Sequence, residues 1–439
     1  MKVVIAIDSF KGSMSSMEAG MAAREGVLRA CDAQVVVRPL ADGGEGTTEA
    51  LVEGLGGTYA EVSVTGPMGE PVTARYGILQ TKKESMGDAD SVKVNTACAA
   101  DNNGKAEKLA VMEMAEASGI TLVKREDLNP WRASTTGVGQ MIRDAIAQGC
   151  REFLIGIGGS ATTEGGIGML QALGYEFYDK NEELLPPVFS SLGRIARIDD
   201  QHIVPELEEC HFQIACDVTN PLCGENGAVY VFGPQKGVRL EEREEMDRQM
   251  RHFAEETERY LDEKESSADI PPEGRGCHPA RAERTRILKN ASHLAGAGAA
   301  GGLGFAFLSY LPNVELKSGI SIVLDAIRLE QELSDADVVL TGEGRLDGQT
   351  AMGKVPVGVA HLAKKYGCRV IAFAGSVTDD AAACNAEGID AYFPIVRGVT
   401  TLDEAMDRDT AKKNMSMAVE QVFRLVKSCG ACSFKKFKN

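Results

Sequence analysis

Apolar runs of four or five residues alternate with polar, glycine-rich loops near the start of the chain. Residues 3–7 form a β-branched run, a polar loop follows at 8–13, and apolar residues at helical spacing come next. Residues 35–37 begin a second round, with a loop at 41–47 and another helical segment. This order predicts parallel strands joined by helices. Since ligands bind at the carboxyl ends of such strands, we expect both loops to lie at a binding edge.

The middle of the chain has a different pattern. Residues 59–79 alternate and are broken by Gly-Pro and Gly-Glu-Pro, which favours antiparallel strands. A helix is predicted over 109–117, and a charged amphipathic helix over 240–261. Residues 153–170 read as a strand, a glycine-rich loop and a helix, and a further strand and loop cover 212–220. A loop of this kind can bind an anion, although it is also an ordinary turn between strand and helix.

Strand and helix alternate again near the end of the chain. The expected segments are strands at 337–340, 370–374 and 392–396, helices at 357–365 and 415–426, and a polar loop at 341–347. The simplest arrangement places residues 1–58 and 290–439 in one doubly wound α/β domain, into which a second α/β domain, residues 59–289, is inserted. Polar, aperiodic residues at 82–105 and 264–289 are expected to be surface insertions.

Composition narrows the function. The chain has 439 residues, a net charge of −17 and 44% hydrophobic residues, which suits a globular protein of two domains. The negative charge disfavours binding to nucleic acid or to an anionic membrane. No apolar run approaches the ~18 residues that span a bilayer, and residues 1–10 read as a strand rather than a signal peptide. Cys429 and Cys432 form a CxxC without a second pair for zinc. We expect a cytoplasmic protein.

Carboxylates, cations and hydroxyls gather in the loops predicted to follow strands. Carboxylate oxygens without paired His or Cys suit Mg²⁺, while cations and glycine N–H groups suit phosphates. Together they are the parts of a phosphoryl-transfer site, although any single acid could instead cap a helix or form a surface ion pair. The set comprises Asp8, Asp42, Asp217, Glu343, Asp347, Lys11, Arg345, Ser160 and Thr163.

Two familiar signatures are incomplete. Residues 296–301 match GxGxxG but follow no clear strand, which disfavours a dinucleotide site. Residues 348–354 match GxxxxGK, but Val355 stands where a P-loop has the Ser or Thr that binds Mg²⁺. The sequence also has no HExxH and no GxSxG, so a zinc protease and an α/β-hydrolase are both disfavoured.

Long motifs spread along the whole chain resemble those of the bacterial class I glycerate kinases. The matching segments are AIDSFKGS (6–13), PLADGGEGT (39–47), GIGGSATTEGG (156–166), CDVTNPLCG (216–224), FGPQKG (232–237), GAGAAGGLG (296–304), SGI (318–320), TGEGRLDGQT (341–350) and GKVPVGVA (353–360). The resemblance implies two α/β domains, one of them discontinuous and flavodoxin-like, with the active site in the cleft between them. It implies ATP-dependent phosphorylation of D-glycerate with Mg²⁺, usually to 2-phosphoglycerate. Glu164 stands where the family often has Asp or Asn.

On that resemblance we assign expected roles. Asp42 is the first candidate and Asp217 the second for the residue that orients the substrate hydroxyl and accepts its proton. Lys11 and Arg345 would hold the glycerate carboxylate or the transferring phosphate. Nucleotide phosphates would bind Gly158, Gly159, Ser160, Thr163, Gly43 and Gly44. Mg²⁺ would bind Glu343, Asp347 and Asp8.

Alternatives remain at this point. The hydroxyl that is phosphorylated could be the 3-hydroxyl, or the substrate could be another small hydroxy acid. A regulator that binds a sugar acid without catalysis is a more distant possibility, and an NAD-dependent oxidoreductase is less favoured still. The oligomeric state, monomer or homodimer, is left open.

Overall fold

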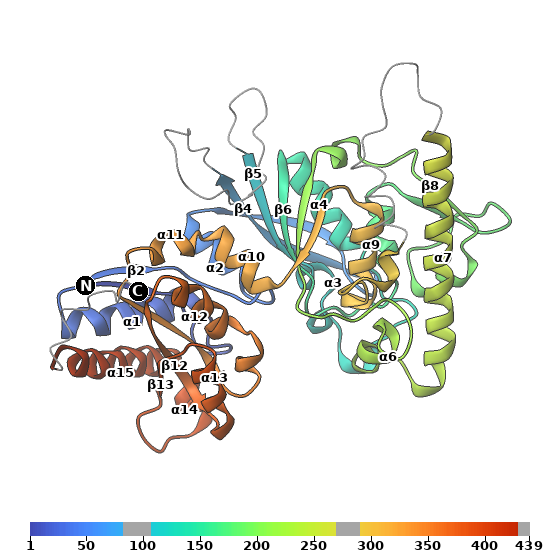
Figure 1. The fold of residues 1–439 in the computed structure, drawn as a ribbon. Coiled ribbons are helices and arrows are strands. Elements are labelled where there is room, and N and C mark those ends of the chain that lie inside the picture. The colour runs from blue at the N-terminus through green and yellow to red at the C-terminus, as the bar shows by residue number, and fades with distance from the viewer. Residues whose placement is uncertain (82–106, 269–289, 429–439) are drawn as a thin grey trace. The chain divides into compact units, whose positions relative to one another are not determined.

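The computed structural model describes residues 1–81, 107–268 and 290–428. The chain divides into two compact units: Met1–Gly57 with Ser318–Asn439, and Thr58–Lys317. Both units are built from a β-sheet and helices, which confirms the expected α/β class (Figure 1). The proposed insertion at 82–105, most of that at 264–289 and the Cys429–Cys432 pair lie outside the described residues. In the described part of the chain, no helix is long and apolar enough to cross a bilayer.

The first unit holds a sheet of five parallel strands in the order β13-β12-β11-β1-β2. Numbered by their appearance within this unit, the strands run 2-1-3-4-5, which is the order of the flavodoxin-like doubly wound fold. Val3 aligns with Val35 on one side and with Val338 on the other. The strands are β1 (Lys2–Ile5), β2 (Gln34–Val37), β11 (Val338–Leu346), β12 (Arg369–Val377) and β13 (Ala391–Pro394).

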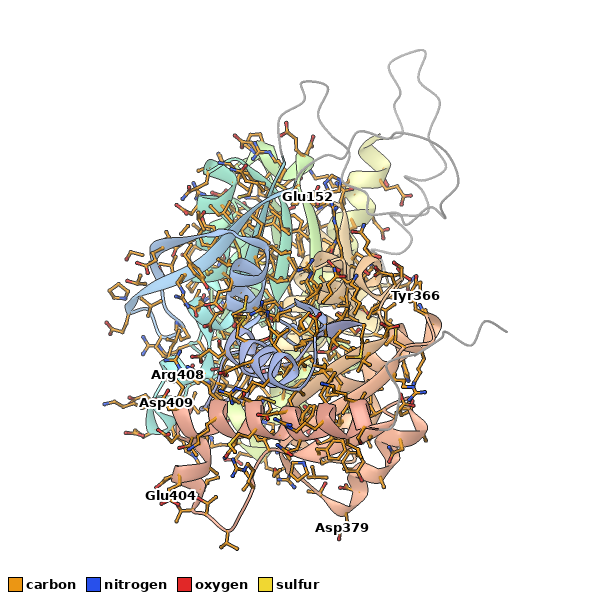
Figure 2. The ribbon with its side chains drawn as sticks, turned by 90° about the vertical axis from the view of Figure 1, so that its left-hand side faces the viewer. Glu152, Tyr366, Asp379, Glu404, Arg408 and Asp409 are labelled. Carbon is orange, nitrogen blue, oxygen red and sulfur yellow. The ribbon has the colours of Figure 1, made fainter. Side chains whose placement is uncertain are left out.

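Helices cover both faces of this sheet. On one face α1 (Ser16–Ala30) and α15 (Arg408–Ser428) lie side by side over Ile5 and Phe373 (Figure 1). Arg408, at the start of α15 (Figure 2), donates to Glu18 of α1 at 2.6 Å. On the other face lie α10 (Gly319–Ala326), α11 (Leu329–Leu333) and α12 (Val355–Lys365), with α2 (Thr47–Leu55) beside α10. Shorter helices are α13 (Ala383–Ala386) and α14 (Leu402–Met406).

The second unit has a mixed sheet of six strands in the order β10-β9-β6-β5-β4-β3. Strand β4 pairs antiparallel with β3 and with β5, which confirms the expectation for residues 59–79, and the remaining neighbours pair parallel. The strands are β3 (Thr58–Thr65), β4 (Pro71–Thr81), β5 (Glu107–Glu113), β6 (Cys150–Gly156), β9 (His211–Ala215) and β10 (Val314–Lys317). A separate antiparallel pair is formed by β7 (Glu176–Tyr178) and β8 (Arg197–Asp199).

Helices pack around this second sheet over an aromatic core. Phe153 of β6 stacks on Phe212 of β9 with ring centroids 4.8 Å apart. The helices are α3 (Ala115–Ser118), α4 (Thr136–Ala147), α5 (Ile167–Ala172), α6 (Ala228–Phe232), α7 (Arg243–Ala268) and α9 (Leu303–Tyr310). Helix α7 is the charged amphipathic helix expected over 240–261.

Two expectations about single elements were wrong. The helix predicted over 109–117 is mostly strand β5, whose central residues are completely buried between β4 and β6. A strand buried on both faces is a continuous apolar run, which periodicity does not separate from a buried helix. The loop predicted at 341–347 is largely strand, because β11 continues beside β12 as far as Leu346.

Residues 290–317 belong to the second unit, although we expected them in the first. The reason is local: β10 pairs in parallel with β9, with Val314 opposite Phe212. Phe307 of α9 also packs on the ring of Phe212, at a centroid distance of 6.2 Å. This segment therefore completes the second sheet and its core.

Candidate active-site residues in the two units

In the first unit, three carboxylates lie at the carboxyl ends of neighbouring strands, and we call Asp8, Asp42 and Glu343 the acidic cluster. Asp8 follows β1, and its backbone N–H donates to Gly342 O of β11 at 2.9 Å. Asp42 lies in the loop after β2, and Glu343 is within the last part of β11. The parallel order of β11, β1 and β2 places all three at one edge of the sheet.

Burial and neighbouring negative charge raise the pKa of two members of the acidic cluster, Asp8 and Glu343. Asp8 is 6% exposed, and burial together with the negative charges of Asp42 and Glu343 raises its pKa to about 7. The N–H of Ser9, 2.7 Å from Asp8 Oδ1, and the Lys11 ammonium oppose this shift. Burial also raises the pKa of Glu343. The cluster is therefore a place where a cation would be stabilised.

The loop that carries Asp42 is fixed by close backbone contacts. Asp42 Oδ1 accepts from Gly44 N at 3.0 Å. Gly43 has a φ of +84°, which only glycine adopts without strain. Gly319, at the start of α10, approaches so closely that a Cβ there would lie 1.9 Å from Asp42 O. These contacts hold the Asp42 backbone, and its side chain stays partly exposed.

Asp347 has a structural role in this unit. Its Oδ1 accepts from the N–H groups of Gln349 and Thr350 at 3.0 and 3.3 Å, which holds the turn that leads into the short 3-10 helix Thr350–Met352. Arg345 lies on the exposed side, with its Nε 3.6 Å from Asp347 Oδ2. Asp347 therefore stabilises its own turn, and its contact with Mg²⁺ stays a prediction.

Sequence reasoning missed one cation near the cluster, Lys354. It directly precedes α12, its Nζ lies 4.0 Å from Asp347 Oδ1, and its charge lowers the pKa of Glu343. Lys354 is the lysine of the GxxxxGK match that lacks the P-loop hydroxyl. The motif was set aside for its missing Mg²⁺ ligand, and its lysine was set aside with it.

Whether Mg²⁺ fits this unit depends on how many ligands the protein must supply. No three His, Cys, Asp or Glu side chains converge as a metal site anywhere in residues 1–81, 107–268 and 290–428. Mg²⁺, however, is commonly held by one or two carboxylates together with substrate phosphates and water. Asp8 is buried and Glu343 is half-buried, and both lie near other negative charges, so these two carboxylates suit a site of this kind.

In the second unit, the glycine-rich loop, residues 156–166, connects β6 to α5. Gly158 and Gly159 are exposed, and a Cβ at Gly158 would meet nothing within 4 Å. Gly156 is the register partner of Ala215, so Gly158 and Asp217 each lie two residues beyond the same level of neighbouring strands. The structure therefore places these two predicted site residues at the same edge of the second sheet.

The glycine-rich loop also contains buried polar side chains, Thr163 and Glu164. The side chain of Thr163 is fully buried, which places it beneath the loop rather than on its surface. Glu164 is also fully buried; its Oε1 accepts from Thr135 N at 2.8 Å, and burial raises its pKa. Gly301, of the GxGxxG match, packs against the loop, and a Cβ there would lie 2.2 Å from Thr162 O. The glycines of that match therefore serve packing within the unit.

A buried lysine lies against the same loop, and sequence reasoning did not identify it. Lys236 is 1% exposed, and its Nζ donates to Ser160 Oγ at 2.7 Å and to Thr162 O at 2.5 Å. Burial lowers its pKa to about 7, against the negative charge of Glu164. Burying an ammonium group costs several kcal/mol. Its motif, FGPQKG, was visible, but nothing in those six residues indicates that the lysine is buried.

Comparisons with known proteins cover nearly the whole chain. A family model described as "Glycerate kinase family" matches residues 3–427. A glycerate kinase of Haemophilus influenzae is 40% identical over 97% of this chain and 99% of its own length. A glycerate 2-kinase of Escherichia coli is 41% identical over 92% of this chain and 93% of its own. A crystal structure provisionally described as a glycerate kinase 2 of Salmonella typhimurium matches with a TM-score of 0.79 and 38% identity, covering 98% of this chain and 99% of that one.

Proposed function

The chain belongs to the glycerate kinase family and is therefore a kinase, and we propose that it transfers the γ-phosphoryl group of ATP to the 2-hydroxyl of D-glycerate. The relative from Escherichia coli bears the name glycerate 2-kinase, which favours the 2-hydroxyl. The observation that carries the mechanism is the acidic cluster at the ends of β1, β2 and β11, with Lys11 beside it. Phosphoryl transfer needs both negative and positive groups, placed for a hydroxyl and for phosphates.

Asp42 is the proposed proton acceptor. Its loop is held by Gly43, Gly44 and Gly319, while its carboxylate stays partly exposed. A carboxylate fixed in this way orients the attacking hydroxyl and accepts its proton as the O–P bond forms. Asp8 suits this role less well, because its pKa of about 7 leaves it partly protonated near neutral pH.

The anionic groups of the substrates need local cations on a protein whose net charge is −17. Lys11 and Arg345 are proposed to bind the glycerate carboxylate or the transferring phosphate, and the exposed glycines of the glycine-rich loop with Ser160 to bind nucleotide phosphates. Mg²⁺ is proposed to contact Asp8 and Glu343; when bound, it would neutralise phosphate charge during transfer.

One coupled assay tests the proposal. Purified protein is mixed with D-glycerate, MgATP and enolase, without phosphoglycerate mutase. Because enolase accepts 2-phosphoglycerate, immediate formation of phosphoenolpyruvate supports the 2-hydroxyl. A signal that needs added mutase assigns the 3-hydroxyl instead. Folded protein that releases no ADP in response to glycerate would contradict the proposed substrate.

A further inference from the structure

The contact between Lys236 and Ser160 joins two segments far apart in sequence. Lys236 ends a short 3-10 helix, Pro234–Lys236, that follows α6, whereas Ser160 lies in the glycine-rich loop. Lys236 also donates to Thr162 O, so its ammonium holds the loop at two points. Among the residues that the structure describes, it is the only lysine or arginine that is buried.

Hydrogen-bond chemistry fixes the direction of the Lys236–Ser160 contact. The protonated form of Lys236 can only donate, so Ser160 Oγ is the acceptor of that hydrogen bond. A hydroxyl has one hydrogen of its own, and that hydrogen remains for another acceptor. Within 1–81, 107–268 and 290–428, the one side-chain hydrogen bond of Ser160 Oγ is the bond that it accepts from Lys236.

The neighbours of Ser160 leave room for a ligand. Gly158 and Gly159 are exposed, and the space at the Gly158 Cα is open. The loop is held from below, because Ile120 N donates to Gly159 O at 2.8 Å and Ala161 N to Ser118 O at 2.9 Å. A fixed loop with open space on one side can present a hydroxyl hydrogen to an anion.

We propose that Lys236 is a positioning residue that, by donating to Ser160 from below, directs the Ser160 hydroxyl hydrogen to a phosphate oxygen of the nucleotide. This inference rests on the proposed function, since it takes ATP to be the ligand of the glycine-rich loop. The lysine does not touch the nucleotide. It acts through Ser160, whose hydroxyl becomes a better donor when it accepts a charge-assisted hydrogen bond.

Three variants test the coupling: Lys236→Met, Ser160→Ala and the double variant. Each single change is expected to raise the KM for ATP and the Kd for ATP, measured calorimetrically without glycerate, about tenfold. The KM for glycerate is expected to change less than about twofold. The double variant should be no worse than either single variant, because both remove the same interaction. Lys180→Met, an exposed lysine of the same unit, is the matched control.

Several outcomes would overturn the inference. One is an unchanged affinity for ATP in either single variant, and another is additive losses that reach about a hundredfold in the double variant. If Lys236→Met does not fold, Lys236→Gln supplies a neutral donor for the same measurements, and Ser160→Ala by itself still decides whether the hydroxyl binds ATP. The wild type is assayed first: wild-type protein that does not phosphorylate glycerate contradicts the proposed function, whereas an active wild type beside unaffected variants contradicts this inference alone.

Discussion

The acidic cluster of the first unit and the glycine-rich loop of the second bury charge in opposite ways. Asp8, Asp42 and Glu343 bring like charges together, and the pKa of Asp8 rises to about 7. The loop instead covers one positive charge, Lys236, whose pKa falls to about 7. Burial favours the neutral form in both places. The first arrangement would favour a bound cation, and we propose that the second supports donors to a phosphate group.

Substitution of Asp42 should have the largest effect on catalysis. Asp42→Asn removes the proposed proton acceptor and keeps the shape of the side chain, so we expect kcat to fall about 10³-fold. Steady-state kinetics and the melting temperature are measured together. Asp379→Asn, at an exposed acid of the same unit (Figure 2), is the control. Turnover of Asp42→Asn near that of the wild type would move the role of proton acceptor to another group.

Gly301→Ala should destabilise the second unit where Gly301 packs against the glycine-rich loop. The residue has a φ of +71°, and its Cβ would lie 2.2 Å from Thr162 O. We expect a loss of about 3 kcal/mol in the free energy of unfolding, read as a lower melting temperature. Gly149→Ala, at a φ of +86° with open space around it, should cost only about 1 kcal/mol. Equal melting temperatures for the two variants would refute the steric argument.

Asp8→Asn tests whether the acidic cluster of the first unit binds Mg²⁺. The variant lacks one of the two carboxylates proposed to contact Mg²⁺, so we expect the Mg²⁺ concentration for half-maximal activity to rise about tenfold. Activity is measured against free Mg²⁺ at saturating ATP. The exposed Asp32→Asn serves as the matched variant. An unchanged Mg²⁺ dependence would contradict the contact between Asp8 and Mg²⁺ and would indicate that the substrate phosphates bind the metal without it.

The smallest expected effect concerns pH and Lys236. In the unfolded chain this lysine keeps its proton up to about pH 10.5, whereas in the folded protein it loses the proton near pH 7. The unfolded state therefore binds more protons above pH 7, and stability rises with pH. Between pH 6 and 8 the wild type should gain about 1 kcal/mol relative to Lys236→Met, as measured by denaturant unfolding. Glu164, the neighbouring carboxyl group, is present in both proteins. Parallel pH profiles would contradict the burial of a titrating ammonium.

The sequence predicted the order of the elements well, because strand, loop and helix each leave local marks. The antiparallel pair around residues 59–79 is one example, because Gly-Pro and Gly-Glu-Pro mark the turn between its two strands. The β5 segment was misread for the opposite reason. Its apolar run is buried on both faces, and its partners in the sheet are not visible in local sequence.

The sequence predicted the loops of the candidate site better than it predicted the buried side chains that contact those loops. Asp8 and Asp42 come together because their strands are neighbours, and an alternation of strands and helices predicts that. Lys236 escaped notice since its partner Ser160 lies 76 positions away in the chain. The hydrogen bonds that Asp347 accepts from the N–H groups of Gln349 and Thr350 became evident only in three dimensions.

The sheet order of the first unit has a consequence for how the protein is made. Strand β1 pairs with β11, so Val3 acquires its neighbour Val338 only after most of the chain has left the ribosome. The second unit, Thr58–Lys317, is complete before β11 has been synthesised. Domains generally fold as units, in the order in which they become available. The middle of this chain can therefore fold while its first strand, already next to β2, still lacks its second neighbour β11, which reverses the usual order from the N-terminus.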